Sequence, residues 1–141
     1  MTTIEHRPAR TRRLPQAALT AAAVATVTNL AIWAASDAAL DPIRAPGDGA
    51  PVALGWYAVI AATVVGVALA TVVLVLVRRL TPAPREAFIA AVAIGTLLSL
   101  GGPFSGDLDT GNRVALAAMH LVTGTVAVSL LAPTLPVRSR R

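Results

Sequence analysis

The residues of this chain best suited to chemistry are an arginine and a histidine on one face of a predicted helix near the C-terminus. Successive intervals of four, three and four residues place side chains on the same side of an α-helix. These intervals separate Arg113, Ala117, His120 and Gly124. A membrane-embedded imidazole can act as an acid or base, or hydrogen-bond to a neighbouring helix. His120 lies in an uncharged run of membrane-spanning length, so it is the first candidate for a functional site.

Other polar residues lie at a similar predicted depth. Asn29, Ser99 and His120 are each about six or seven residues from the outer end of their helix, or ~9–10 Å deep at ~1.5 Å per residue. We expect Asn29 to lie within hydrogen-bonding reach of His120, below an ion pair at the interface. The candidate ligand-binding pocket therefore comprises Asn29, Trp33, Asp37, Ser99, Arg113 and His120, with Asp37 and Arg113 as the pair.

Each of these residues also has a structural interpretation, which the sequence leaves open. His120 can be a neutral packing residue, and the amide of Asn29 can join two helices. Ser99 can return its hydroxyl to its own helix backbone. Asp37 and Arg113 can be interfacial anchors without forming a site.

The composition indicates a membrane protein. The 141 residues are 55% hydrophobic and 13% charged, whereas a soluble domain carries about 25% charged residues. Cysteine is absent, which excludes disulfides and thiolate metal sites. The twelve basic residues are all arginine, which we interpret as the coding bias of a GC-rich bacterial genome. They flank apolar runs, so we expect the lipid bilayer as a partner and no nucleic acid.

The predicted fold is all-α, a four-transmembrane-helix bundle. Its helices cover about 17–37, 52–77, 84–105 and 112–132, within a membrane domain of residues 17–133. Basic tails of residues 1–16 and 134–141 flank that domain. A signal peptide is the alternative for the first run, whose nineteen uncharged residues at 17–35 exceed a usual signal core. Gly101-Gly102-Pro103 should end or bend the third helix, and Asp109 or Thr110 should cap the fourth.

The arginines predict the orientation in the membrane. Ten of the twelve lie in the two tails and the link between the second and third helices. Arg44 and Arg113 lie in the other two loops, beside five aspartates. By the positive-inside rule both termini are cytoplasmic, and we expect a multi-pass protein of the bacterial cytoplasmic (inner) membrane.

Small residues predict how two of the helices pack. They recur at every fourth position in the second and third helices, which a short link makes antiparallel neighbours. Such stripes let two backbones approach closely in lipid. The two sets are Ala58, Ala62, Gly66 and Ala70, and Ala87, Ala91, Gly95 and Ser99.

The sequence excludes several specific functions. A haem with two histidine ligands needs both within the spans, but His6 is in the tail. No span carries the central carboxylate of a proton-coupled exporter, and no paired-histidine motif of a metalloprotease is present. We therefore assign no catalytic residue, no metal ligand and no cofactor.

Three short stretches resemble a known family. They are Arg44-Ala45-Pro46-Gly47, Leu54-Gly55, and the run from Arg113 to Val122 that contains Met119-His120. The chain is similar over roughly residues 17–133 to small actinobacterial four-helix membrane proteins filed as a domain of unknown function. The resemblance implies four spans and draws attention to Arg113 and His120, but it supplies no catalytic residue.

Three functions from different classes remain. The first is a non-enzymatic accessory or interaction subunit, with self-association or a membrane protein partner left open. The alternative is a small binder or carrier that takes an apolar or anionic ligand from the outer side through His120 and Arg113. The third is an intramembrane enzyme that uses His120 as acid or base. An open cavity reaching His120 would favour the binder, whereas a filled bundle with His120 bonded to Asn29 would favour the accessory subunit.

Overall fold

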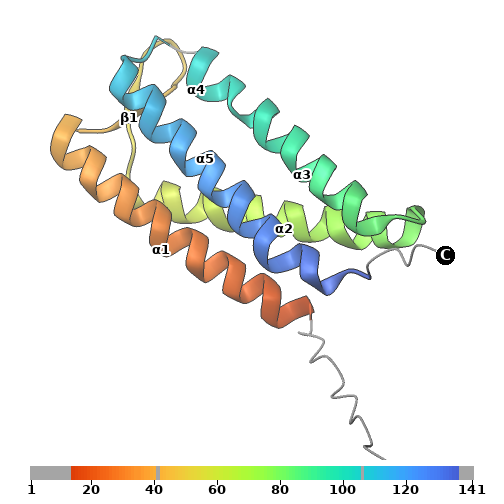
Figure 1. Cartoon of the computed structure of the whole chain (residues 1–141). Coiled ribbons are helices and arrows are strands. Elements are labelled where there is room, and N and C mark those ends of the chain that lie inside the picture. Colours follow the sequence, from red (N-terminus) through yellow and green to blue (C-terminus); the bar gives the residue numbers. More distant parts are fainter. Residues whose placement is uncertain (1–13, 41, 106, 137–141) are drawn as a thin grey trace, which may run out of the picture.

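The chain folds into a bundle of four membrane-spanning helices, as the sequence predicts (Figure 1). The computed structural model describes residues 14–40, 42–105 and 107–136. Within these residues four helical segments are long and apolar enough to cross a membrane: Leu14–Leu40, Trp56–Leu80, Pro84–Phe104 and Thr110–Thr134. Most of the two predicted basic tails lies outside the described residues.

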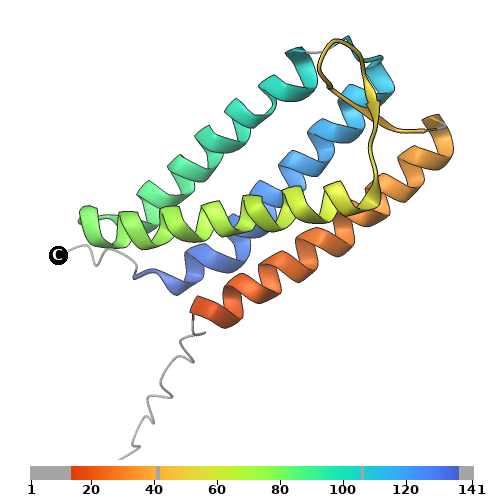
Figure 2. The same cartoon turned by 180° about the vertical axis from the view of Figure 1, so that it is seen from behind.

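The helices run α1 (Leu14–Leu40), α2 (Trp56–Leu80), α3 (Pro84–Ser99), α4 (Gly101–Ser105) and α5 (Thr110–Leu131). A 3-10 turn, η1 (Ala132–Thr134), follows α5. α1 packs against α2 and α5, and α3 packs against the same two helices from the other side. The start of α1, the α2–α3 link and the end of α5 lie at one end of the bundle (Figures 1 and 2). The described ends of the chain and the α2–α3 link therefore lie on the same side, as four spans require.

The third span is interrupted where the sequence predicts it. α3 ends at Ser99, Leu100 forms a turn, and α4 continues from Gly101. Pro103 has no backbone N–H to donate to the preceding turn, so the regular hydrogen-bond ladder cannot pass through it. The amide of Phe104 still bonds the carbonyl of Leu100 at 3.3 Å, which keeps α4 attached to the helix before it.

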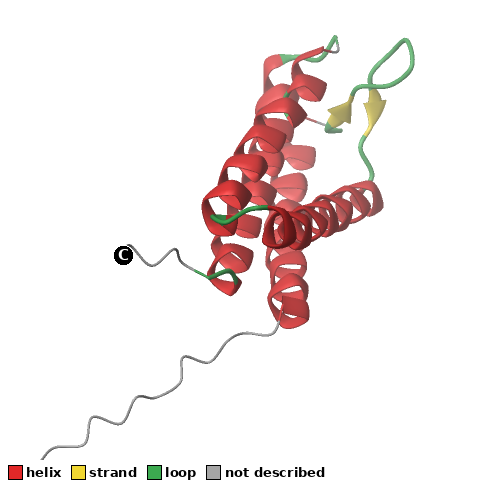
Figure 3. Ribbon diagram, turned by 90° about the vertical axis from the view of Figure 1, so that its right-hand side faces the viewer, coloured by secondary structure: helices red, strands yellow, loops and turns green. Residues whose placement is uncertain are grey.

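The segment between α1 and α2, expected to be an irregular loop, contains a short β-hairpin. Strand β1 (Arg44–Ala45) pairs antiparallel with β2 (Val52–Ala53), which leads directly into α2 (Figure 3). Gly49 adopts a φ of 89°, a left-handed conformation that glycine accepts at the tip. The prediction that the second helix begins at Val52 is wrong, because β2 occupies that position and α2 begins at Trp56.

The hairpin is fastened by three side chains to the end of the bundle opposite the α2–α3 link. The indole of Trp33 donates to the carbonyl of Leu54 at 2.7 Å, and Asp37 accepts from the amide of Ile43 at 3.1 Å. The side-chain oxygen of Asn112, on α5, accepts from the amide of Arg44 at 2.6 Å. The fully buried side chain of Ile43 packs below these bonds among Val59, Ala115 and Met119.

The close-packed stripe of small residues lies on α1. Its buried residues recur every fourth position: Ala17, Ala21, Ala25 and Asn29. Ala21 and Ala25 pack with Val67 of α2, and Val126 and Leu130 of α5 lie against this group. Small side chains let helix backbones approach in lipid, where apolar burial cannot drive association.

The stripes predicted on α2 and α3 do not pack against each other. The two helices meet at the link of residues 81–83 and diverge toward the hairpin end (Figures 1 and 2). Phe88, fully buried beside Leu74 and Leu131, holds them together near the link. Beyond it most of the predicted stripe residues line a cavity, and a Cβ at Gly95 would meet no atom within 4 Å. The prediction that α2 and α3 are neighbours is confirmed, but the prediction that their small-residue stripes contact each other is wrong.

The close approach of α3 to another helix occurs at Gly124 of α5. A Cβ at Gly124 would lie 2.3 Å from the hydroxyl oxygen of Thr96 and 3.3 Å from its Cβ. Gly124→Ala should therefore lower the free energy of unfolding by about 1–3 kcal/mol, a usual range for overpacking. Gly95→Leu should leave it within about 0.5 kcal/mol of the parent, because its side chain enters open space.

Thermal or denaturant unfolding in detergent measures both variants. Thr96→Ala should restore most of the stability of Gly124→Ala, since it removes the atoms that a new methyl group would meet. An equal loss in Gly124→Ala and Gly95→Leu would contradict this account of the packing.

Asp109 caps α5, one of the two residues predicted for that role. Its carboxylate accepts from the backbone amide of Asn112 at 3.0 Å and also from the Asn112 side chain. The backbone bond from Asn112, then the side-chain bond, then that from Gly111 hold the pKa of Asp109 below its usual value of 3.8. The charged carboxylate is therefore the form that the folded chain stabilises.

This lowered pKa predicts an acid-dependent contribution to stability. The contribution is complete above the unfolded pKa near 3.8 and is lost as the pH falls through the lower, folded pKa. Asp109→Asn keeps a capping oxygen but cannot titrate. We expect it to melt below the parent at pH 7, with the difference closing as the pH falls below the unfolded pKa near 3.8 and through the lower, folded pKa. A difference that stays constant across that range would contradict the prediction.

Candidate functional site

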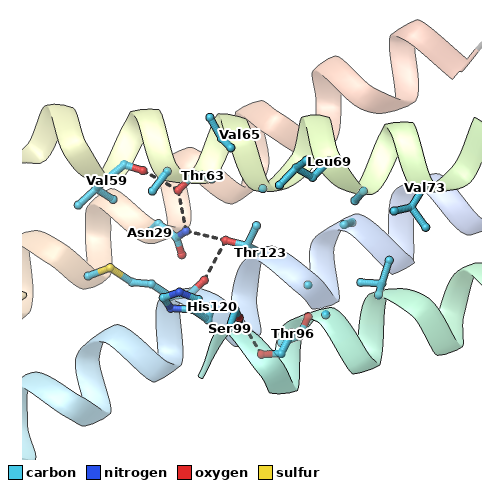
Figure 4. Close-up of a pocket in the computed structure, with 18 of the residues that line it drawn as sticks. Asn29, Val59, Thr63, Val65, Leu69, Val73, Thr96, Ser99, His120 and Thr123 are labelled. Atoms are coloured by element: carbon cyan, nitrogen blue, oxygen red, sulfur yellow. Dashed lines mark hydrogen bonds between the residues drawn. The ribbon is translucent and has the colours of Figure 1, made fainter. Parts of the chain in front are cut away.

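One buried amide joins three helices in the middle of the bundle. Asn29 of α1 is 2% exposed, and its Nδ2 donates to Thr63 Oγ1 of α2 and Thr123 Oγ1 of α5. Both bonds are 2.9 Å long, and both are drawn in Figure 4. No water competes for hydrogen bonds in the hydrocarbon core, so these contacts fix the relative positions of α1, α2 and α5.

The two threonines can accept these bonds because their own protons are used elsewhere. Thr63 donates to the carbonyl of Val59 at 2.7 Å, and Thr123 donates to that of Met119 at 2.9 Å. Each carbonyl lies one turn earlier in the same helix, a common bond for threonine within helices. Each hydroxyl oxygen therefore keeps a lone pair that can accept a proton from the Asn29 amide. The Oδ1 of Asn29 itself is buried and has no partner among the described residues.

His120 is half-buried on the face of α5 beside this amide cluster. Its Nδ1 lies 2.8 Å from the carbonyl oxygen of Leu116, one turn earlier in α5. A carbonyl only accepts hydrogen bonds, so Nδ1 carries the proton in the neutral imidazole. Nε2 is then an unprotonated acceptor, with no partner among the residues that the structure describes.

A cavity of about 480 Å³ opens between α2 and α3, with α5 behind it. Its polar end contains Asn29, Thr63, Ser99, His120 and Thr123 (Figure 4). Small and aliphatic side chains line the remainder, including Ala62, Gly66, Leu69, Val73, Ala91, Val92 and Gly95. The volume falls within the range of about 300–1,000 Å³ that is typical of small-molecule sites.

The cavity exists because α2 and α3 diverge while α5 keeps contact with both. Val65, Leu69 and Gly95 line it and are also exposed, so it is open on the side between α2 and α3. At the end opposite the α2–α3 link the hairpin approaches through Leu54, which belongs to the lining. In a membrane the open side faces the lipid.

The structure brings together only half of the predicted pocket. Asn29, Ser99 and His120 line the cavity as expected. The expected Asn29–His120 bond is wrong, because Asn29 bonds two threonines and His120 bonds its own helix. Ser99 also bonds its own helix, donating to the carbonyl of Thr96 at 2.7 Å.

The predicted lid is absent from the cavity. Among the described residues Trp33, Asp37 and Arg113 do not line it. Trp33 and Asp37 fasten the hairpin instead, through the carbonyl of Leu54 and the amide of Ile43. The expected ion pair between Asp37 and Arg113 stays a prediction.

Sequence reasoning missed Thr63 and Thr123. Both lie within apolar runs at the depth of Asn29, and a buried amide needs two acceptors for its two protons. That requirement could have pointed to mid-span threonines on neighbouring helices. No group of three or more histidine, aspartate or glutamate residues that could hold a metal ion occurs within the described ranges.

Comparisons with known proteins identify a family but no characterised relative. The model of a family of unknown function (DUF6069) matches residues 9–137, which include all four spans. No curated protein and no solved structure matches the chain. The resemblance of the sequence to a four-helix family of unknown function is thereby confirmed.

The bonding around Asn29 predicts an asymmetric response to mutation. Asn29→Leu removes the whole amide, including its unpaired carbonyl, and leaves both threonine hydroxyls bonded to their own helices. Since interhelical bonds in membranes average about 0.6 kcal/mol, we expect a loss of about 1 kcal/mol. Thr123→Val leaves one amide proton of Asn29 without an acceptor, which should lower the free energy of unfolding by about 1–3 kcal/mol.

A double-mutant cycle measured by unfolding in detergent tests this difference. The variant carrying both Asn29→Leu and Thr123→Val should be no less stable than Thr123→Val alone, since it contains no amide proton without an acceptor. Strictly additive losses would show that the two side chains do not interact as described.

Proposed function

Since the chain belongs to the DUF6069 family of unknown function, we propose its function from the geometry of the site: it binds a long apolar molecule drawn from the bilayer. The chain is a multi-pass membrane protein with four apolar spans. The proposed ligand occupies the cavity between α2 and α3, with its polar end toward Asn29 and His120. This is the binder or carrier function weighed from the sequence.

The observation that carries the proposal is the open cavity at His120. A filled bundle would have left room only for structural roles of the polar residues. Here His120 bonds its own backbone and lines a space of about 480 Å³. The geometry thus supports the binder over the accessory subunit.

The shape and lining of the cavity support a chain-like occupant. Aliphatic and small side chains line most of its length, and its polar groups gather at the end nearer the hairpin (Figure 4). A molecule with a hydrocarbon chain and one small polar group matches this distribution. Arg113 lies outside the lining, so the anionic ligand considered from the sequence has no cationic partner in the cavity.

We further propose that the polar end of the cavity lies in the outer half of the bacterial cytoplasmic membrane. Arg78, Arg79 and Arg85 are at the bundle end that holds the α2–α3 link, and the hairpin is at the other. The positive-inside rule places the arginine end in the cytoplasm. The ligand is then taken from the outer leaflet.

The lipids that travel with the protein test this function. The parent, Gly95→Leu and Ala90→Leu are extracted into polymer-bounded nanodiscs, and bound lipids are compared by mass spectrometry. Gly95→Leu projects into the cavity, whereas Ala90 is exposed on the same helix and does not line the cavity. We expect one lipid to be enriched over the bulk membrane in the parent and in Ala90→Leu. In Gly95→Leu its amount should fall about tenfold, which corresponds to about 1.4 kcal/mol in binding free energy.

Equal lipid content in all three proteins would contradict the proposal. A protein that instead co-purifies at constant stoichiometry with each variant would support the accessory subunit. The melting temperature of Gly95→Leu serves as the control, because lost binding is informative only if the variant remains folded.

A further inference from the structure

Four residues at the polar end of the cavity have their hydrogen-bond donors already engaged. Both protons of the Asn29 amide go to threonines, and the hydroxyls of Thr63 and Thr123 go to backbone carbonyls. Ser99 donates to a carbonyl of its own helix. The hydroxyl oxygen of Thr96, beside Ser99, packs against Gly124, 2.3 Å from where a Cβ on that glycine would lie.

Two acceptors at this end remain open. In the neutral imidazole of His120, Nε2 is the acceptor because the carbonyl of Leu116 requires the proton on Nδ1. Oδ1 of Asn29 is buried and finds no donor within the described part of the chain, while the residue itself is only 2% exposed. Both residues belong to the lining of the same cavity. The polar end therefore offers one acceptor, His120 Nε2, to an incoming molecule, while Asn29 Oδ1 is enclosed beside it.

The lining also lacks formal charge. Among the described residues that form it, none is arginine, aspartate or glutamate. An anionic head would lie against two acceptors with no cation to compensate it, and burying an unpaired charge is strongly unfavourable. A neutral group with a hydrogen to donate can instead satisfy the acceptor of His120.

We propose that the cavity selects a neutral long-chain molecule whose head donates a hydrogen bond from a hydroxyl group to His120 Nε2. This inference rests on the proposed function, because it specifies which bilayer molecule the cavity accepts. A long-chain alcohol is the simplest member of the class.

Three probes with the same chain separate the effect of the head from that of the chain. 1-Hexadecanol donates a hydrogen bond, hexadecyl methyl ether only accepts, and palmitate carries a negative charge. Each is titrated into the full-length protein in nanodiscs of a single phosphatidylcholine. The protein carries ¹³C-labelled Val and Leu methyl groups and ¹⁵N-labelled histidine, with His6→Gln so that His120 gives the only imidazole signals.

The two labels report different events. Methyl groups of Leu69 and Val73, which line the cavity, report entry of a chain whatever its head. The ¹⁵N resonances of His120 report its tautomer and any hydrogen bond to Nε2. We expect the Nδ1–H tautomer before titration, and a shift of the Nε2 resonance with 1-hexadecanol but not with the ether.

The expected affinity, from the methyl titration, is at least about tenfold higher for 1-hexadecanol than for the ether or palmitate. His120→Phe, which keeps an aromatic ring but removes the acceptor, should reduce this preference to about twofold or less while still admitting chains. Gly95→Leu should abolish the methyl shifts for every probe.

The outcomes separate this inference from the function on which it rests. If no probe shifts the methyl groups beyond the change seen in Gly95→Leu, the cavity does not bind chains and both proposals fail. If the ether or palmitate binds as tightly as the alcohol, or if His120 carries its proton on Nε2, the cavity binds chains but the donor selectivity is overturned.

Discussion

The structure depends on a single constraint: in hydrocarbon, a buried amide must find its hydrogen-bond partners within the protein. Asn29 meets most of this constraint with two threonines, one on α2 and one on α5. The three helices are thereby fixed at one depth and in one rotation, since the bonds are directional and no water replaces them. The alanine stripe of α1 supports the same arrangement by allowing close contact with α2 and α5.

The fourth span is held differently, and the cavity is the consequence. No side-chain hydrogen bond among the described residues links α3 to another helix. Phe88 anchors it near the link, and the contact of Thr96 with Gly124 holds its middle against α5. Because nothing comparable draws α3 toward α2, the two helices separate beyond the link. The polar groups that fasten the other three helices therefore form one end of an open space.

Features that depend on local chemistry were predictable from the sequence. The four spans follow from uncharged runs, the interruption at Leu100 from Gly101-Gly102-Pro103, and the cap of α5 from Asp109. Features that depend on how the helices are rotated about their axes could not be predicted from the sequence. Small residues on α2 and α3 give the same pattern whether they meet a neighbour or line a gap, and composition cannot distinguish the two. The depths of Asn29 and His120 were matched correctly, but depth alone does not select a threonine over a histidine as partner.

The hairpin has a consequence for how an occupant would be exchanged. Fastened through Trp33, Asp37 and Asn112, it covers the end of the bundle opposite the α2–α3 link, while the gap between α2 and α3 opens sideways. The ligand would then enter and leave the cavity within the plane of the bilayer and not through the aqueous phase. Occupancy would follow the mole fraction of the ligand among the surrounding lipids, so dilution of the cell suspension would leave it unchanged, whereas a change in lipid synthesis would alter it directly.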